Sequence, residues 1–264
     1  MNTQGRPSQL RPCHSPGTHP ISSEAVIRTE GYVMKIGIIG AGQIGGTLTR
    51  RFTATGHHVK VANSRGPQTL TALAQETGAQ AATVQDAVKD VDLIVVTIPE
   101  KNIPALGKTP FEGVPSHVVI VDTGNYYPRE RDGRIAAIES GTPESVWVSE
   151  QIGRPVIKAF NNIYARHLLE NGKPAGTPGR IALPVAGDDL SAKRVVIKLI
   201  DDIGFDAVDT GPLAESWRQQ PGTPVYCGDF DVAGVRKALN EASPKRTAQW
   251  TATDNSPGDF GAPS

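Results

Sequence analysis

The chain is poor in several features that would point to particular classes of protein. It has two cysteines in 264 residues, Cys13 and Cys227, and no C-x-x-C pair, which argues against a disulfide framework and against a metal site. Lys and Arg together number 27, as do Asp and Glu, so no overall field favours nucleic acid or anionic lipid. No apolar run approaches the roughly 18 to 20 residues of a membrane span. We expect a cytoplasmic protein that binds a small molecule and has no nucleic-acid or membrane partner. A homodimer is a possible assembly.

Both ends of the chain have the composition of segments that do not form a packed core. Residues 1–33 contain four prolines and no apolar stretch of the kind found in secretory signals, so we predict a disordered extension. Met34 precedes the first predicted strand and is a candidate start of translation, whereas an organellar transit peptide is the alternative. Residues 244–264 are rich in serine, proline and glycine and are also predicted to be disordered.

Between these ends, short apolar runs alternate with amphipathic segments, which is typical of parallel strands joined by crossover helices. Ile44, Leu48 and Phe52 recur at helical spacing after the first strand, and a second clear helix is predicted over 190–203. We predict an α/β Rossmann domain over residues 34–210, doubly wound around a mainly parallel sheet, followed by a short helical C-terminal appendage over 211–243. The predicted strands are Lys35–Ile39, Val59–Ala62, Ala82–Val84, Leu93–Ile98, Val118–Val121, Val156–Phe160, Ile181–Ala186 and Ala207–Val208.

A glycine-rich loop follows the first predicted strand directly and opens the first helix. Residues 40–45 read Gly-Ala-Gly-Gln-Ile-Gly, the G-x-G-x-x-G pattern of dinucleotide-binding proteins. Gly40 permits the tight turn, Gly42 leaves room for a pyrophosphate, and Gly45 lets helix and strand pack closely. Gln43 and Ile44 begin the helix, where free N–H groups bind phosphate oxygens. The pattern predicts a nucleotide site.

The second predicted strand ends in residues that favour NADP over NAD. An NAD site usually has an acidic residue about 20 positions after the glycines, but no acidic residue occurs from Gly40 to Gln75. Asn63, Ser64 and Arg65 stand there instead, and a guanidinium can form two charged hydrogen bonds to a 2′-phosphate. A solvated loop arginine is the alternative for Arg65.

Six motifs follow one another along the chain. They are Ile-Gly-Ile-Ile-Gly-Ala-Gly (36–42), Ala-Asn-Ser-Arg-Gly (62–66), Val-Val-Thr-Ile-Pro (95–99), Val-Ile-Lys-Ala-Phe-Asn-Asn (156–162), Val-Ala-Gly-Asp-Asp (185–189) and Asp-Thr-Gly-Pro-Leu (209–213). In this order and spacing, the series resembles the coenzyme F420-dependent NADP oxidoreductase family over about residues 35–215. The resemblance implies NADP(H) binding and hydride exchange with F420 or a flavin, and the same fold also serves the NADPH domain of STEAP-type ferric reductases.

The resemblance also implies that loops at the strand ends surround the nicotinamide, as expected for ligands of parallel sheets. Residues 122–155 depart from the archaeal members of the family, so the identity of the acceptor stays open. Pro99 could equally be structural, and Asn161 with Asn162 could equally cap a helix. The candidate cofactor contacts in these loops are Thr97, Ile98, Pro99, Asn125 and Asn161.

Three functions fit this sequence. The first is an NADPH-dependent reductase of a flavin or deazaflavin, in which the stacked rings need little further protein chemistry. The second is an imine or ketone reductase, which would usually need a proton donor; His167 and Lys158 are candidates, but we assign neither as catalytic. The third is a noncatalytic NADP(H)-binding sensor.

Overall fold

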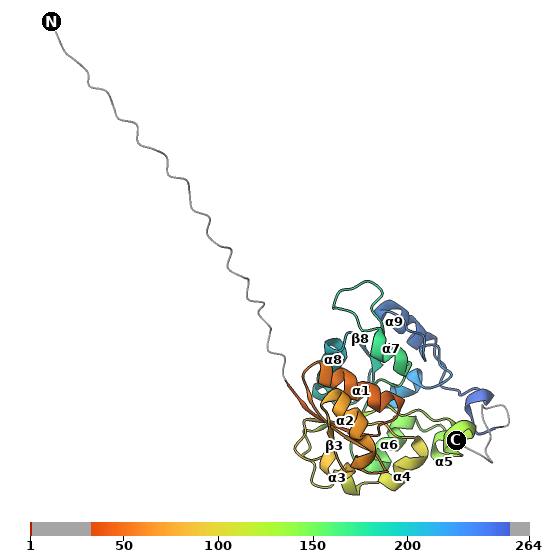
Figure 1. Cartoon of the computed structure of the whole chain (residues 1–264). Helices are drawn as coiled ribbons and strands as arrows, with labels where there is room; N and C mark the ends of the chain where they lie inside the picture. Colours follow the sequence, from red (N-terminus) through yellow and green to blue (C-terminus); the bar gives the residue numbers. More distant parts are fainter. Residues whose placement is uncertain (2–32, 254–264) are drawn as a thin grey trace. The chain divides into compact units, whose positions relative to one another are not determined.

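The structure, a computed structural model, describes Met1 and residues 33–253. Secondary structure in these residues belongs to one unit, Val33–Ser264 (Figure 1). The predicted N-terminal extension lies outside the described residues apart from Met1 and Val33, as does the predicted tail beyond residue 253. Among the described residues, no helix has the length and apolar character needed to cross a membrane.

Six parallel strands form the main sheet, in the order β3-β2-β1-β4-β5-β6. Two further strands, β7 and β8, pair in parallel with each other, and an antiparallel bridge between Lys158 and Ala186 links this pair to β6. The strand order confirms the predicted Rossmann fold, in which the order reverses beside β1. The strands are β1 (Lys35–Ile39), β2 (His58–Ala62), β3 (Gln80–Ala81), β4 (Leu93–Val96), β5 (Val119–Asp122), β6 (Ile157–Lys158), β7 (Ala182–Val185) and β8 (Asp206–Asp209).

Helices cover both faces of the main sheet and the outer face of the β7–β8 pair. The α-helices are α1 (Gln43–Ala54), α2 (Thr71–Thr77), α3 (Val84–Ala87), α4 (Ile103–Leu106), α5 (Ala136–Glu139), α6 (Glu144–Ile152), α7 (Ala165–Glu170), α8 (Leu190–Asp202) and α9 (Val232–Glu241). Shorter helical turns are η1 (Pro67–Leu70), η2 (Glu100–Asn102), η3 (Thr109–Phe111), the π-helical η4 (Pro128–Asp132), η5 (Leu213–Gln219) and η6 (Ala248–Trp250).

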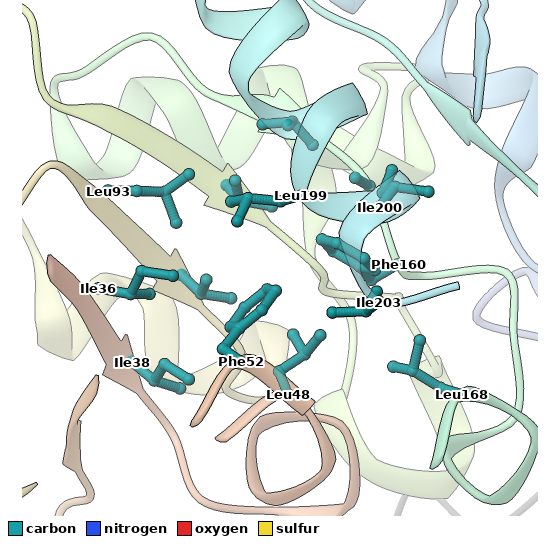
Figure 2. Packing of buried hydrophobic residues seen from close by; sticks show 14 of the residues in the cluster. Ile36, Ile38, Leu48, Phe52, Leu93, Phe160, Leu168, Leu199, Ile200 and Ile203 are labelled. Atoms are coloured by element: carbon teal, nitrogen blue, oxygen red, sulfur yellow. The ribbon is translucent and has the colours of Figure 1, made fainter. Parts of the chain in front are cut away.

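The alternation of side chains along the strands builds two cores, one on each face of the sheet. Ile36 and Ile38 of β1 belong to the core under α1 and α8, whereas Ile39 belongs to the core under α4 and α6. Figure 2 shows Leu48 and Phe52 of α1 in the first core, with residues from α8 packed above them. These contacts fix α1 on the sheet and so position the glycine loop at its N-terminus.

Most strand boundaries differ from the prediction by one or two residues, and two of these differences have a clear local cause. The third strand was expected at Ala82–Val84 but lies at Gln80–Ala81, because the Thr83 side chain accepts a hydrogen bond from the Asp86 amide at 3.1 Å and starts α3. The sixth strand was expected to reach Phe160, but that residue has a φ of 62° and turns the chain away from the sheet. The next residues therefore form a loop at the carboxyl end of the sheet.

The segment 244–253, which we call the C-terminal strap, is the described part of the stretch 244–264 predicted to be disordered, and it makes contacts with the domain. Arg246 forms an ion pair with the buried Glu144 of α6. Ala252 is buried; its carbonyl accepts a hydrogen bond from Arg134 at 2.6 Å, and its amide donates to Glu139 at 2.9 Å. Composition predicted disorder because the segment is polar, but its attachment is made through polar contacts.

Candidate functional site

The glycine loop has the geometry that a nucleotide-binding turn needs. Gly40 has a φ of 112°, and a Cβ there would lie 2.1 Å from the carbonyl oxygen of Thr97. A Cβ on Gly45 would lie 2.0 Å from the carbonyl oxygen of Gly40, so this glycine permits the close packing of α1 against β1. At Gly42, by contrast, a Cβ would meet no described atom within 4 Å. The space in front of Gly42 is therefore open to a ligand.

The start of α1 has the polarity of an anion site. Gln43 and Ile44 lie in the first turn, where amides have no intrahelical acceptor, and that turn holds no acidic residue. No side chain of the described residues caps this helix end. The residues fit a pyrophosphate, which would accept the hydrogen bonds of these amides.

The turn after β2 is held in place by its own side chains. The Asn63 Oδ1 accepts from the Arg65 amide at 3.0 Å, and its Nδ2 donates to the Thr69 hydroxyl at 2.9 Å. Ser64 and Arg65 are exposed, and no hydrogen bond or ion pair to the Arg65 guanidinium is present in the described part of the chain. Arg65 is therefore available to a ligand anion.

Arg65 and Gly42 line the same open groove, with a volume of about 500 Å³. Glu76, which follows the acid-free stretch of the sequence, also lines it. Arg50 bonds both oxygens of Glu76, at 2.6 and 2.7 Å, and this bond lowers the pKa of Glu76. The sequence analysis missed this acidic residue, whose charge Arg50 offsets.

The loops after β4, β5 and β6 meet at the carboxyl edge of the sheet. Thr97, Ile98 and Pro99 are half-buried there, and the Thr97 side chain lies against Gly45. Asn125 follows β5, and Asn161 follows β6. The structure thus brings together the residues predicted to surround the nicotinamide, next to the glycine loop.

Asn161 and Asn125 are joined in a network of side-chain amides. Asn125 Nδ2 donates to the Asn161 carbonyl at 2.8 Å, and Asn161 Nδ2 donates to Asn125 Oδ1 at 3.0 Å. Gln219 of η5 donates to Asn161 Oδ1 at 2.9 Å and accepts from Asn161 Nδ2 through its carbonyl at 2.6 Å. The alternative that Asn161 or Asn162 caps a helix is not observed, since α7 begins after Tyr164 without a side-chain cap. Asn161 therefore fixes the two neighbouring loops.

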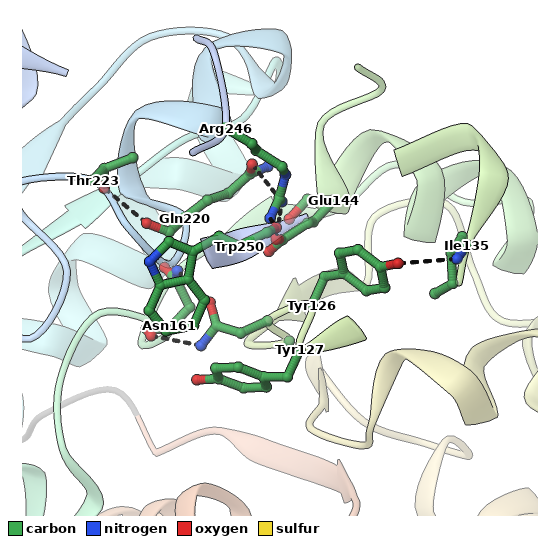
Figure 3. Close-up of polar contacts among 12 residues, drawn as sticks. Tyr126, Tyr127, Ile135, Glu144, Asn161, Gln220, Thr223, Arg246 and Trp250 are labelled. Atoms are coloured by element: carbon green, nitrogen blue, oxygen red, sulfur yellow. Dashed lines mark hydrogen bonds and ion pairs between the residues drawn. The ribbon is translucent and has the colours of Figure 1, made fainter. Parts of the chain in front are cut away.

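Beside this network lies an aromatic group formed by Tyr127, Tyr226 and Trp250 of the C-terminal strap. The two tyrosine hydroxyls are hydrogen-bonded to each other, and burial raises the pKa of each. The Trp250 ring centroid lies 6.2 Å from that of Tyr127 and 6.4 Å from that of Tyr226. Figure 3 shows Trp250 and Tyr127 with Asn161 in the same cluster.

The two proton donors considered from the sequence are both engaged elsewhere. The Nδ1 atom of His167, in α7, lies against the Asp229 carboxylate. Lys158 is fully buried, and its ammonium lies 3.1 Å from the Asp122 carboxylate and donates to the Gly124 carbonyl. Burial is the largest single effect and opposes the charged form of Lys158, but Asp122 and the neighbouring carboxyl groups together outweigh it and raise the pKa of Lys158. Lys158 therefore presents no free proton to a substrate, and His167 does not line the groove that Gly42 and Arg65 share.

Sequence reasoning missed a set of buried carboxyl groups at the same edge of the sheet. They belong to Glu100 after β4, Asp122 at the end of β5, Asp132 of η4 and Glu144 of α6. Charged residues directly after apolar strand segments were the available signal, because such residues are rarely buried without partners. Among the described residues, no group of three or more His, Cys, Asp or Glu side chains is arranged to hold a metal ion.

Comparisons with known proteins bear on the family and the fold of this chain. The model of the family described as NADP oxidoreductase, coenzyme F420-dependent, matches residues 35–126, which hold the glycine loop and the strand ends. A hypothetical protein of Sinorhizobium meliloti is 31% identical, with a TM-score of 0.63, over 75% of this chain and 95% of that one. A proposed F420-dependent NADP reductase of Arthrobacter sp. FB24 shares the fold, with 20% identity and a TM-score of 0.55, over 69% of this chain and 87% of that one.

A curated relative is similar over a shorter stretch. The protein YjhV of Escherichia coli K12 is 50% identical over 69 residues, which make up 26% of this chain and 50% of that protein. The chain thus spans about half the length of this relative.

Proposed function

Because residues 35–126 match the model of the coenzyme F420-dependent NADP oxidoreductase family, we propose that this chain is a member and acts as an NADPH-dependent reductase with a flat, flavin-like acceptor. When bound, NADPH supplies the hydride, and a flavin or the deazaflavin F420 accepts it. The residues of this chain bind and orient the two partners.

One observation carries the cofactor assignment. Gly42, with open space in front of it, and Arg65, with an unpaired guanidinium, line the same groove. The amides of the first turn of α1 bind the pyrophosphate, and Arg65 with Ser64 binds the 2′-phosphate of NADP(H). The residues after β4 to β6 then surround the nicotinamide, with Asn161 holding Asn125 in place.

The aromatic group supports a flat acceptor. Tyr127 and Trp250 lie beside the loops proposed to hold the nicotinamide, with Arg131 over one face of the Tyr127 ring at 4.9 Å from its centroid, and stacking on aromatic side chains suits a conjugated ring. A stacked pair of rings needs mainly proximity and orientation.

An imine or ketone reductase is the second candidate, but it would usually use a proton donor that reaches the substrate. Lys158 is buried against Asp122, and His167, whose Nδ1 lies against Asp229, does not line the groove that Gly42 and Arg65 share. This arrangement favours the flavin-like acceptor.

A panel of acceptors tests the proposal. NADPH oxidation is followed at one nucleotide concentration with F420, FMN, riboflavin, ferric chelates and simple imines. We expect turnover with F420 or a flavin and little with imines. Turnover with imines alone would identify an imine reductase, and NADPH binding without turnover on any acceptor would indicate the sensor.

A further inference from the structure

The buried acids at the carboxyl edge of the sheet are unevenly matched with cations. Three of the four carboxylates each form an ion pair, so three negative charges meet three positive charges. The pairs are Asp122 with Lys158 at 3.1 Å, Asp132 with Arg131 at 2.9 Å, and Glu144 with Arg246.

Glu100 is the fourth acid, and it has no such partner. Its side chain is 0% exposed, and neither carboxyl oxygen forms a hydrogen bond within the described residues. An ionised carboxylate in such a place would be costly, so Glu100 holds a proton in the free protein. Burial, followed by the charge of Asp122, raises the pKa of Glu100 well above its ordinary value.

Glu100 lies directly behind the loops proposed to hold the nicotinamide. It follows Pro99 in the chain, and its Oε1 lies so close to Gly124 that a Cβ on that glycine would be 2.4 Å away. The carboxyl group thus lies against the Gly124 backbone, one residue before Asn125, and one residue after Pro99 in the chain. A charge placed in the site acts on Glu100 through low-dielectric protein.

The charge in this site differs between the two redox states of the cofactor. The nicotinamide ring is neutral in NADPH and carries one positive charge in NADP⁺, whereas the phosphates are the same in both. A positive charge favours the ionised form of a nearby carboxyl group. Glu100 alone among the four acids lacks a cation. We therefore expect its protonation state to change most when that positive charge is present.

We propose that Glu100 loses its proton when NADP⁺ is bound and keeps it when NADPH is bound, so that this carboxyl group offsets the charge of the oxidised cofactor. The O–H bond of Glu100 breaks, the electron pair stays on the carboxylate, and the proton passes to the buffer. This inference rests on the proposed function, since it needs the nicotinamide at this edge of the sheet.

Charged groups from each neighbouring element set the range in which Glu100 titrates. Three neighbouring carboxylates oppose its ionisation, and two cations favour it. They are Asp122 of β5, Glu144 of α6, Asp132 and Arg131 of η4, and Lys158 of β6.

Calorimetry tests the proposal without any acceptor. NADP⁺ and NADPH are each titrated into the full chain between pH 6 and 9, in buffers that differ in ionisation enthalpy, to count the protons released on binding. Protons from the 2′-phosphate cancel in the difference between the two nucleotides. We expect NADP⁺ to release up to about one proton more than NADPH, and its affinity relative to NADPH to rise by up to about tenfold per pH unit within that window.

Glu100→Gln removes the titrating group, so the difference in released protons should fall to near zero while both nucleotides still bind. Glu112→Gln, which changes an exposed acid outside the site, should behave as the wild type. Glu100→Met serves as a second variant where the glutamine protein does not fold. Equal proton release for both nucleotides in the wild type, or an unchanged difference in Glu100→Gln, overturns the inference. Binding of neither nucleotide overturns the proposed function instead.

Discussion

Asp122 and Lys158 lie directly opposite each other in the register of β5 and β6, and their charged groups are 3.1 Å apart with both side chains almost fully buried. The pair also shapes the loop after β5. Lys158 donates to the carbonyl of Gly124, and Asp122 accepts from the amide of Gly124 at 2.9 Å. The pair therefore fixes the peptide that leads into Asn125.

Removal of one partner of this pair should be strongly destabilising. Lys158→Met leaves the Asp122 charge buried without its cation, and we expect a loss of about 3 to 5 kcal/mol in the free energy of unfolding. The double variant Asp122→Asn with Lys158→Met should recover at least half of that loss, because no uncompensated charge remains. Urea denaturation of the wild type, the single variant and the double variant measures both effects. Equal stability of the single and double variants would contradict the importance of the charge.

Arg65 should decide between NADPH and NADH. A charged hydrogen bond contributes about 1.5 to 3 kcal/mol, so Arg65→Ala should weaken NADPH binding about 10- to 150-fold and change NADH binding little. Ser64→Ala should act in the same direction but less. Arg166→Ala is the matched control, since this arginine lines the same groove but is bound to Glu170. Calorimetry at constant salt measures the affinities, and equal weakening of both nucleotides would make Arg65 a structural residue.

Two glycines of the loop should respond to substitution in different ways. Gly42→Val should abolish nucleotide binding but leave the fold intact, because its side chain enters the space open to the pyrophosphate. Gly45→Val should lower the free energy of unfolding by about 3 kcal/mol or more, since its Cβ would lie 2.0 Å from a backbone oxygen. Thermal melts and nucleotide titrations separate the two outcomes. Tight nucleotide binding by Gly42→Val would exclude the proposed position of the cofactor.

Glu100 should make the protein less stable at alkaline pH. Its pKa is raised in the folded protein, so its contribution is fully present below the pKa of the unfolded chain and is lost as pH rises through the folded value. The free energy of unfolding should therefore fall with rising pH, by up to about 1.4 kcal/mol per pH unit from this group. In Glu100→Gln this part of the slope should disappear. A slope that is the same in both proteins would show that other groups cause it.

The C-terminal strap should depend on its ion pair. Arg246→Met leaves Glu144, which is 0% exposed, without its cation, and should cost about 3 kcal/mol or more. Arg246→Met combined with Glu144→Gln should be closer to the wild type. Limited proteolysis should cut the strap faster in the single variant, and a cutting rate equal to that of the wild type would show that other contacts hold it.

The parts of this fold that follow from local sequence could be predicted, and those that follow from distant contacts could not. The glycine loop and the apolar strands were found because turn, strand and helix patterns lie within about 20 residues of Gly40. The turn at Phe160 was missed because a non-glycine residue adopts a φ of 62° only when tertiary contacts impose it, and no local sequence pattern shows those contacts.

The buried polar part of the candidate site illustrates the same limit. Lys158 stood out in the sequence as a charge within an apolar run, but its partner is 36 residues away, on the neighbouring strand. The contact of Arg246 with Glu144 spans 102 residues, and composition alone predicted a disordered tail. Pairings of this kind depend on topology rather than on any local pattern.

The distance along the chain between Glu144 and Arg246 has a consequence for synthesis. Helix α6 leaves the ribosome well before residue 246, so for the time needed to make the next 102 residues its buried carboxylate has no cation from the strap. The domain can complete its sheet during translation, but the packing around Glu144 can close only after the strap has emerged. We therefore expect the packing around Glu144 to form last, after the sheet is complete and Arg246 has left the ribosome.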